Sequence, residues 1–130
     1  MRRSCMICTL AVLSACSTAM AVVPDSGNPA HCIAGFHYAA YAFKVAKQPQ
    51  RATPMVARAI FEMEKLRVSG ASEADARAES MALTKNYAND HDRMMTLIEA
   101  CGSAQDSDPK YRAELPRLFA LARSTQASGQ

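Results

Sequence analysis

Three times along this chain a helix-capping residue stands immediately before a proline, at Asn28-Pro29, Thr53-Pro54 and Asp108-Pro109. The side chain of Asn, Thr or Asp can accept a hydrogen bond from the free N–H groups of a first helical turn, and proline at the first helical position sacrifices no bond. Each pair therefore predicts the start of a helix. The chain has no Trp, only 6% aromatic residues and many Ala and Met, which favours closely packed helices over a β-sandwich.

Apolar residues recur at steps of three or four after the first two of these pairs, which is the period of one helix face. The first helix is expected to end before Pro49, and residues 48–53 are expected to form a short polar connection. The second helix is expected to run from Pro54 to Gly70, a residue suited to end a helix.

Ser72, with Asp75 three positions later, resembles a capping box and predicts a third helix that extends to Cys101. Asn and Asp accumulate at residues 86–92, where a break or a bend is expected. Residues 102–107 are expected to form a loop. In the last helical segment Pro116 predicts either a kinked helix or a short turn followed by a new helix.

The predicted fold class is therefore all-α, a small bundle of about four helices closed by one disulfide. The predicted domain organisation is a secretory signal at 1–21, or 1–15 with a lipidated Cys16, then a linker at 22–28, a single helical domain at 29–123 and a disordered tail at 124–130.

The amino-terminal segment carries the features of an export signal. Arg2 and Arg3 precede an apolar run that is too short to span a bilayer as a permanent helix. The sequence LSAC at residues 13–16 resembles the lipobox of bacterial lipoproteins, which implies a lipid on Cys16 and a stable membrane attachment. The sequence AMA at residues 19–21 instead permits ordinary cleavage and a soluble protein that begins at Val22. Both alternatives predict an exported bacterial protein, located in the periplasm or at the outer membrane.

The cysteines agree with export. The chain has five, an odd number, but Cys5, Cys8 and Cys16 lie in the predicted signal. The folded domain would keep Cys32 and Cys101, which should form a disulfide in an oxidising compartment. A bridge across 69 residues would stabilise the domain by about 4 kcal/mol on the loop-entropy model.

Charge argues against a nucleic-acid partner. The formal net charge is +3, but without Arg2 and Arg3 thirteen Lys and Arg face twelve Asp and Glu, a net charge of +1. Pairs such as Glu62/Lys65 and Glu73/Arg77 fit surface ion pairs one helical turn apart. A nearly neutral domain with interspersed charges lacks the basic surface that nucleic acids require.

Residues capable of metal binding or catalysis form no recognisable motif. His31 and His37 are six residues apart and lie on different helix faces, so structural roles are expected for both. His91, Met94 and Met95 share helical spacing and could bind a soft ion such as Cu(I), although such methionines also suit a core. No nucleophile, phosphate-loop or haem motif is found in the sequence.

The predicted function is a non-catalytic exported binding module, with no cofactor and no metal, whose partner is an envelope protein or an apolar ligand. A periplasmic copper-binding protein and a small exported enzyme without a known motif are the alternatives.

Overall fold

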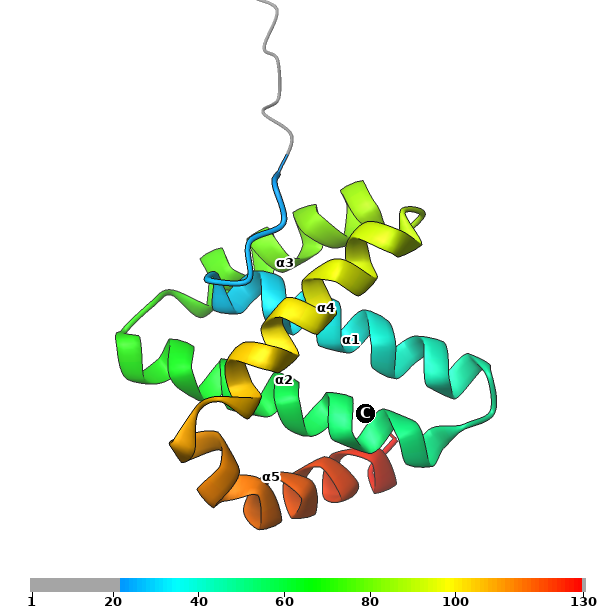
Figure 1. The fold of residues 1–130 in the computed structure, drawn as a ribbon, viewed down its shortest axis with the longest axis vertical. Helices are drawn as coiled ribbons and strands as arrows, with labels where there is room; N and C mark the ends of the chain where they lie inside the picture. Colours follow the sequence, from blue (N-terminus) through cyan, green and yellow to red (C-terminus); the bar gives the residue numbers. More distant parts are fainter. Residues whose placement is uncertain (1–21, 130) are drawn as a thin grey trace, which may run out of the picture.

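The structure, a computed structural model, describes residues 22–129. Within this part of the chain every regular element is a helix, and short turns join consecutive helices. In chain order these are α1 (Pro29–Val45), α2 (Pro49–Ser69), α3 (Glu73–Tyr87), α4 (His91–Asp106) and α5 (Pro109–Ala127), as Figure 1 shows. The all-α prediction is confirmed, but the described residues form five helices rather than four.

The helices pack around α1 and α2, which lie side by side and run in opposite directions (Figure 1). Helix α4 crosses in front of this pair in the view of Figure 1, and α5 follows the outer edge of α2. Helix α3 packs mainly against α1 and makes no extensive contact with α2. Helices α2 and α3 therefore both lie against α1 but pack little against each other.

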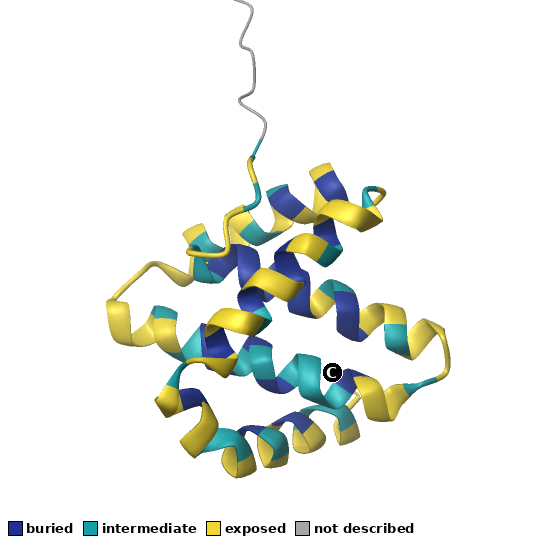
Figure 2. Ribbon diagram, in the orientation of Figure 1, coloured by how far each residue is buried: buried dark blue, intermediate teal, exposed yellow. Residues whose placement is uncertain are grey.

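The core consists of two apolar clusters. The larger surrounds the disulfide and joins α1, α3 and α4 to Ala59 of α2, with fully buried Phe36, Leu83 and Met94 among its members. The smaller lies between α2 and α5, around Phe61 and Leu118. Figure 2 shows buried residues concentrated where α1, α2 and α4 meet.

Small residues allow these helices to approach one another closely, as the composition predicted. A Cβ atom added to Gly35 of α1 would lie 3.1 Å from Cγ1 of Ile98 on α4. Ala52, Ala57 and Ala59 of α2 are completely buried. Interiors pack at the density of organic crystals, so larger side chains here would push helices apart.

The fifth helix arises because the predicted third segment breaks within residues 86–92. Helix α3 ends at Tyr87, and the Asp90 side chain caps α4 by accepting a hydrogen bond from Arg93 N at 3.2 Å. The chain turns here, as expected, and α4 carries Cys101 back to Cys32, with a Cα–Cα distance of 5.7 Å. The predicted disulfide is confirmed.

The predicted start of the second helix is wrong. Helix α2 begins at Pro49, and Pro54 lies inside it rather than at its first position. Pro49 can occupy the first position because no intrahelical bond needs its N–H there. Pro54 leaves the carbonyl of Gln50 without its helical donor, but Gln50 is exposed and water can supply the hydrogen bond.

The predicted loop at residues 102–107 is also wrong, because α4 continues to Asp106. Gln105 is buried and donates hydrogen bonds to Arg58 O and to Glu62 on α2. These contacts with another helix hold the last turn of α4 in place despite Gly102 and two serines nearby. Tertiary packing overrides weak local helix propensity at this position.

The last helix extends beyond its predicted end. Helix α5 is continuous through Pro116, so no new helix begins there, and it reaches Ala127 (Figure 1). Residues 124–127, which were expected to belong to a disordered tail, are therefore helical. Thr53 Oγ1 donates a hydrogen bond to Gln126 Oε1 at 2.5 Å, which fixes the end of α5 to the start of α2.

The predicted linker at residues 22–28 is held against the bundle. Asp25 N donates a hydrogen bond to Nδ1 of the buried His31, and Asn28 donates to Glu79 on α3 at 2.7 Å. The Asn28 side chain also caps α1 by accepting from Ala30 N, as predicted.

Candidate functional site

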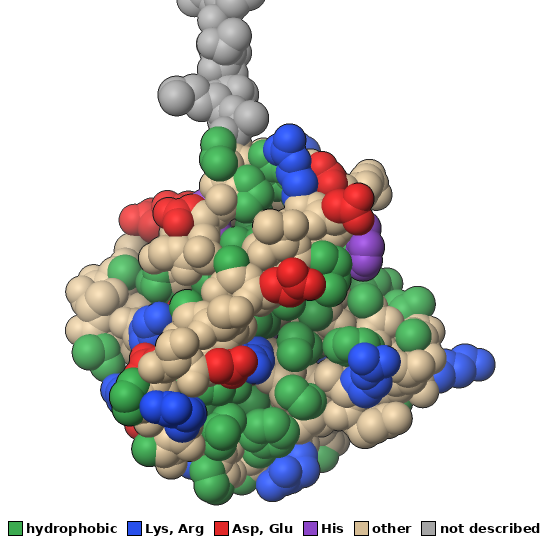
Figure 3. Space-filling view, viewed as in Figure 1, with side chains coloured by type: hydrophobic (Ala, Val, Ile, Leu, Met, Phe, Trp, Pro, Cys, Tyr) green, Lys and Arg blue, Asp and Glu red, His purple; other side chains and the backbone are tan. Residues whose placement is uncertain are grey.

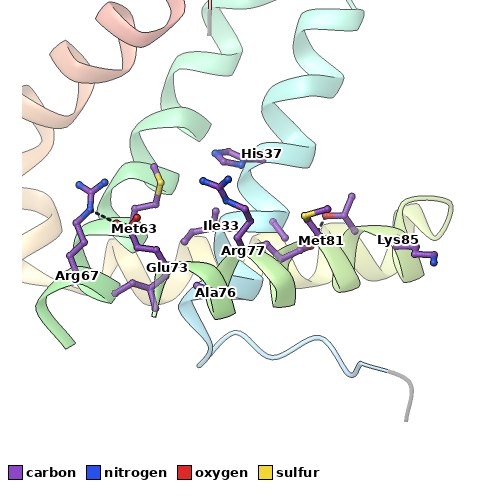
Figure 4. Close-up of a pocket in the computed structure, with 13 residues that line it drawn as sticks. Ile33, His37, Met63, Arg67, Glu73, Ala76, Arg77, Met81 and Lys85 are labelled. Carbon is purple, nitrogen blue, oxygen red and sulfur yellow. Dashed lines mark hydrogen bonds and ion pairs between the residues drawn. The ribbon is translucent and has the colours of Figure 1, made fainter. Parts of the chain in front are cut away.

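A groove of about 670 Å³ lies where α1, α2 and α3 come together (Figure 4). Helix α3 forms one wall along most of its length, while α1 and the end of α2 form the other. Most of its lining side chains are apolar or small, and the exceptions are His37, Arg67, Glu73, Arg77 and Lys85. The lining residues are Ile33, Ala34, His37, Met63, Leu66, Arg67, Glu73, Ala76, Arg77, Ser80, Met81, Thr84 and Lys85.

The turn between α2 and α3 creates this groove. Gly70 ends α2 with φ of 74°, a left-handed conformation that glycine adopts without steric cost, and its N–H bonds back to Leu66 and Arg67. Ser72 then caps α3 by accepting from Asp75 N at 3.3 Å. Two consecutive helix signals thus redirect the chain onto α1, which leaves space between α2 and α3.

The rim of the groove is mainly basic. Arg67 Nε donates a hydrogen bond to Glu73 at 3.1 Å, which joins α2 to α3 at one end of the groove. The predicted Glu73/Arg77 ion pair is wrong, because Glu73 pairs with Arg67 instead. Arg77 and Lys85 have no ion-pair partner among residues 22–129. Three basic side chains and one acidic side chain therefore line the groove.

His37 stands within the groove, and Figure 4 shows the guanidinium group of Arg77 extending towards it. His37 is exposed to solvent, but the surrounding groove walls remove part of the water around its imidazole. This desolvation lowers the pKa of His37 from its ordinary value of 6.5, and the charge of Lys44 lowers the pKa further. The ring is accordingly neutral at neutral pH.

A buried polar cluster joins α2 to α4 away from the groove. Gln105 donates to Glu62 Oε1 at 2.8 Å, while Lys65 lies 3.1 Å from Glu62 Oε2. Arg58 donates to the Gln105 side chain and pairs with Asp106 at 2.9 Å. Within the described part of the chain no buried side-chain polar atom lacks a partner, so the cluster acts in packing. The predicted Glu62/Lys65 ion pair is present, but it is not a surface pair, because Glu62 is only 2% exposed.

The candidate copper ligands are not brought together on one surface. Met94 is completely buried in the larger core cluster, and Met95 packs against that cluster. His91 is exposed, and its Nδ1 lies 3.1 Å from the hydroxyl of Tyr38. The three residues share helical spacing, but packing buries Met94 in the core and leaves Met95 partly buried against it.

His31 and His37 have separate surroundings, as their spacing predicted. His31 is buried beside Glu79, with 4.0 Å between Nε2 and the carboxylate, whereas His37 lines the groove. Residues 22–129 contain no group of three His, Cys, Asp or Glu side chains that could hold a metal ion. The predicted lipidation residue, Cys16, lies outside the described residues.

The helices of the described segment are too short or too polar to cross a membrane. On the face seen in Figure 3, basic and acidic side chains are intermixed.

Sequence reasoning did not find the groove or the buried cluster. Met81 is 66% exposed and belongs to no apolar stripe, so periodicity gave no indication of it. The groove depends on the directions of α2 and α3, which no local pattern specifies. Glu62 and Gln105 gave no signal because Glu and Gln are ordinarily surface residues.

No protein-family model matches the chain, and neither a curated protein nor a solved structure matches it. Function is therefore inferred from the residues and geometry of the groove.

Proposed function

We propose that this protein is a non-catalytic, exported binding module of the bacterial cell envelope that binds an apolar group in the groove between α1, α2 and α3. The observation that carries the proposal is the groove itself, an apolar concavity of about 670 Å³ rimmed by charge. Ligand sites commonly have volumes of about 300–1,000 Å³, apolar walls and a few polar groups.

Exposed apolar walls provide the driving force for binding. Met81 is 66% exposed, and Met63 and Leu66 are only partly buried. Complete burial of one such side chain contributes about 1.5–3 kcal/mol, so covering these side chains gives several kcal/mol towards the cost of the ligand's lost freedom, and burial of the ligand's own apolar surface supplies the rest. Methionine side chains also adapt their shape to different ligands.

A fluorescent apolar probe, anilinonaphthalene sulfonate, tests this proposal. We expect the folded protein to enhance the fluorescence of the probe with saturable affinity. Met81→Asp should weaken binding about tenfold, since it places a charge in the apolar groove. Val68→Asp is the matched control, because Val68 is 81% exposed on α2 and does not line the groove.

Both variants should retain the stability of the wild type, because exposed substitutions ordinarily change it by less than about 0.5 kcal/mol. Equal affinity of the two variants for the probe would mean that the probe binds elsewhere and would contradict the proposed site. Absence of saturable binding to the wild type would refute the proposed function.

Export is the second part of the proposal and is tested by intact mass. The basic residues and apolar run at the amino terminus support it, and so does the disulfide between Cys32 and Cys101. Mass spectrometry of membrane and soluble fractions, with and without reductant, should find a chain that begins at Cys16 with acyl groups or at Val22 without them. A chain that retains Met1 and two free thiols would contradict export.

A further inference from the structure

We propose that the occupant of the groove is an amphipathic helix of a partner protein, with acidic residues beside its apolar face. This inference rests on the proposed function, since it names the kind of partner that supplies the apolar group. The shape and the charge of the groove are the observations that support it.

The groove has a length that suits a helix. Its lining residues on α3 extend from Glu73 to Lys85, twelve residues apart, which corresponds to about 18 Å and to a partner helix of about twelve residues. Figure 4 shows these residues spread along α3, with α1 and α2 beside it.

Small and exposed side chains also favour a helix over a compact ligand. Ala34 and Ala76 allow a partner backbone to approach the groove closely. Met81 is 66% exposed, and the side chains of Arg67 and Glu73 are 65% and 71% exposed. A small ligand would leave much of its own apolar surface in water here, whereas an amphipathic helix would cover the groove with its polar face outward.

The charges select an acidic partner. Glu73 is paired with Arg67, while Arg77 and Lys85 lack an ion-pair partner among the described residues. These two positions are eight residues apart, which is about 12 Å along α3. Acidic residues seven or eight positions apart on the partner helix would therefore face both basic side chains, and such complementarity sets partner choice and association rate.

A displayed library of helices of about fourteen residues tests this inference. Leu, Ile, Met and Phe vary at the apolar positions, and Glu, Lys, Gln and Ala vary at the flanking positions. The library is selected on the immobilised, disulfide-closed protein, and the selected peptides are then compared for binding to the wild type and to the Met81→Asp variant. We expect the selected sequences to be enriched in Glu over Lys at flanking positions.

Charge-reversal variants then measure the ionic contribution. For a selected peptide made synthetically, the combined substitution Arg77→Glu and Lys85→Glu should weaken binding about tenfold at low salt, an effect that salt reduces. The combined substitution Lys47→Glu and Lys110→Glu is the matched control, because it changes the net charge equally at exposed positions outside the groove. The control should bind as the wild type does.

Three results would overturn the inference. The first is a set of selected peptides without enrichment of Glu at the flanking positions. The second is equal weakening of peptide binding by the two double variants. The third is that no peptide binds the wild type more tightly than Met81→Asp. If the apolar probe still binds in the groove in any of these cases, the proposed function stands and only the acidic helix is refuted. A different result would identify a lipid surface as the partner and also refute the helix. In that case no peptide is selected, and the protein binds phosphatidylglycerol vesicles only when Arg77 and Lys85 are present.

Discussion

Loss of the disulfide between Cys32 and Cys101 should be the most damaging single perturbation of this bundle. The bridge spans 69 residues and joins the first turns of α1 to the later part of α4. On the loop-entropy model its removal destabilises the folded state by about 4 kcal/mol. Small domains have a total stability of about 5–15 kcal/mol, so a large share would be lost.

Two forms of the protein separate the contributions to this loss. Reduced wild type loses only the constraint on the unfolded chain, about 4 kcal/mol. The variant with Cys32→Ala and Cys101→Ala also loses two buried sulfur atoms, since both residues are at most 2% exposed. By analogy with deletion of a buried methylene, that cavity adds about 1 kcal/mol per site.

Urea unfolding followed by far-ultraviolet circular dichroism measures both effects. With a slope of about 1.5 kcal/mol/M, the reduced protein should unfold at a urea concentration about 3 M below that of the oxidised protein. The reductant must be present throughout, because the buried bridge is protected in the folded state. A midpoint shift below about 0.5 M would refute the view that the bridge acts by restricting the unfolded chain.

Three further predictions concern a buried amide, a helix cap and the groove histidine, and all are measured by the same unfolding assay. Gln105→Ala should destabilise the fold by about 2–3 kcal/mol because Glu62 loses its buried amide donor; a loss below about 0.5 kcal/mol would show that Glu62 is solvated. Asp90→Ala should lower the free energy of unfolding by about 1 kcal/mol, because α4 loses its cap, and Asp90→Asn should keep most of that stability. As pH falls from about 7 to 5, the wild type should lose stability, because the unfolded chain protonates His37 before the folded chain does. His37→Gln should flatten that decline, and an unchanged pH dependence would contradict the lowered pKa.

The sequence signals for helix starts were correct where the capping side chain accepts a hydrogen bond from the first turn of the same helix. Asn28 and Asp108 cap α1 and α5, with proline at the next position in each case, as the sequence predicted. Ser72 caps α3 by the bond that its spacing predicted. Such hydrogen bonds join residues two or three positions apart, so the sequence specifies them directly.

The same kind of signal failed where distant residues decide the outcome. Thr53-Pro54 has the form of a helix start, yet α2 begins earlier, and the Thr53 hydroxyl bonds to Gln126 at the far end of the chain. The residues after Cys101 look like a loop, yet contacts of Gln105 with α2 keep them helical. In both cases the partner is more than forty residues away.

The sequence by itself determined the helical class, three of the caps and the pairing of Cys32 with Cys101, because each follows from composition or from neighbouring residues. Tertiary structure alone decided the groove, since it arises from the angle at which α2 and α3 leave their common support on α1. It also decided that Met94 lies in the core and Met81 at the surface. Both residues are methionine, so only the packing of the other helices around them distinguishes the two positions.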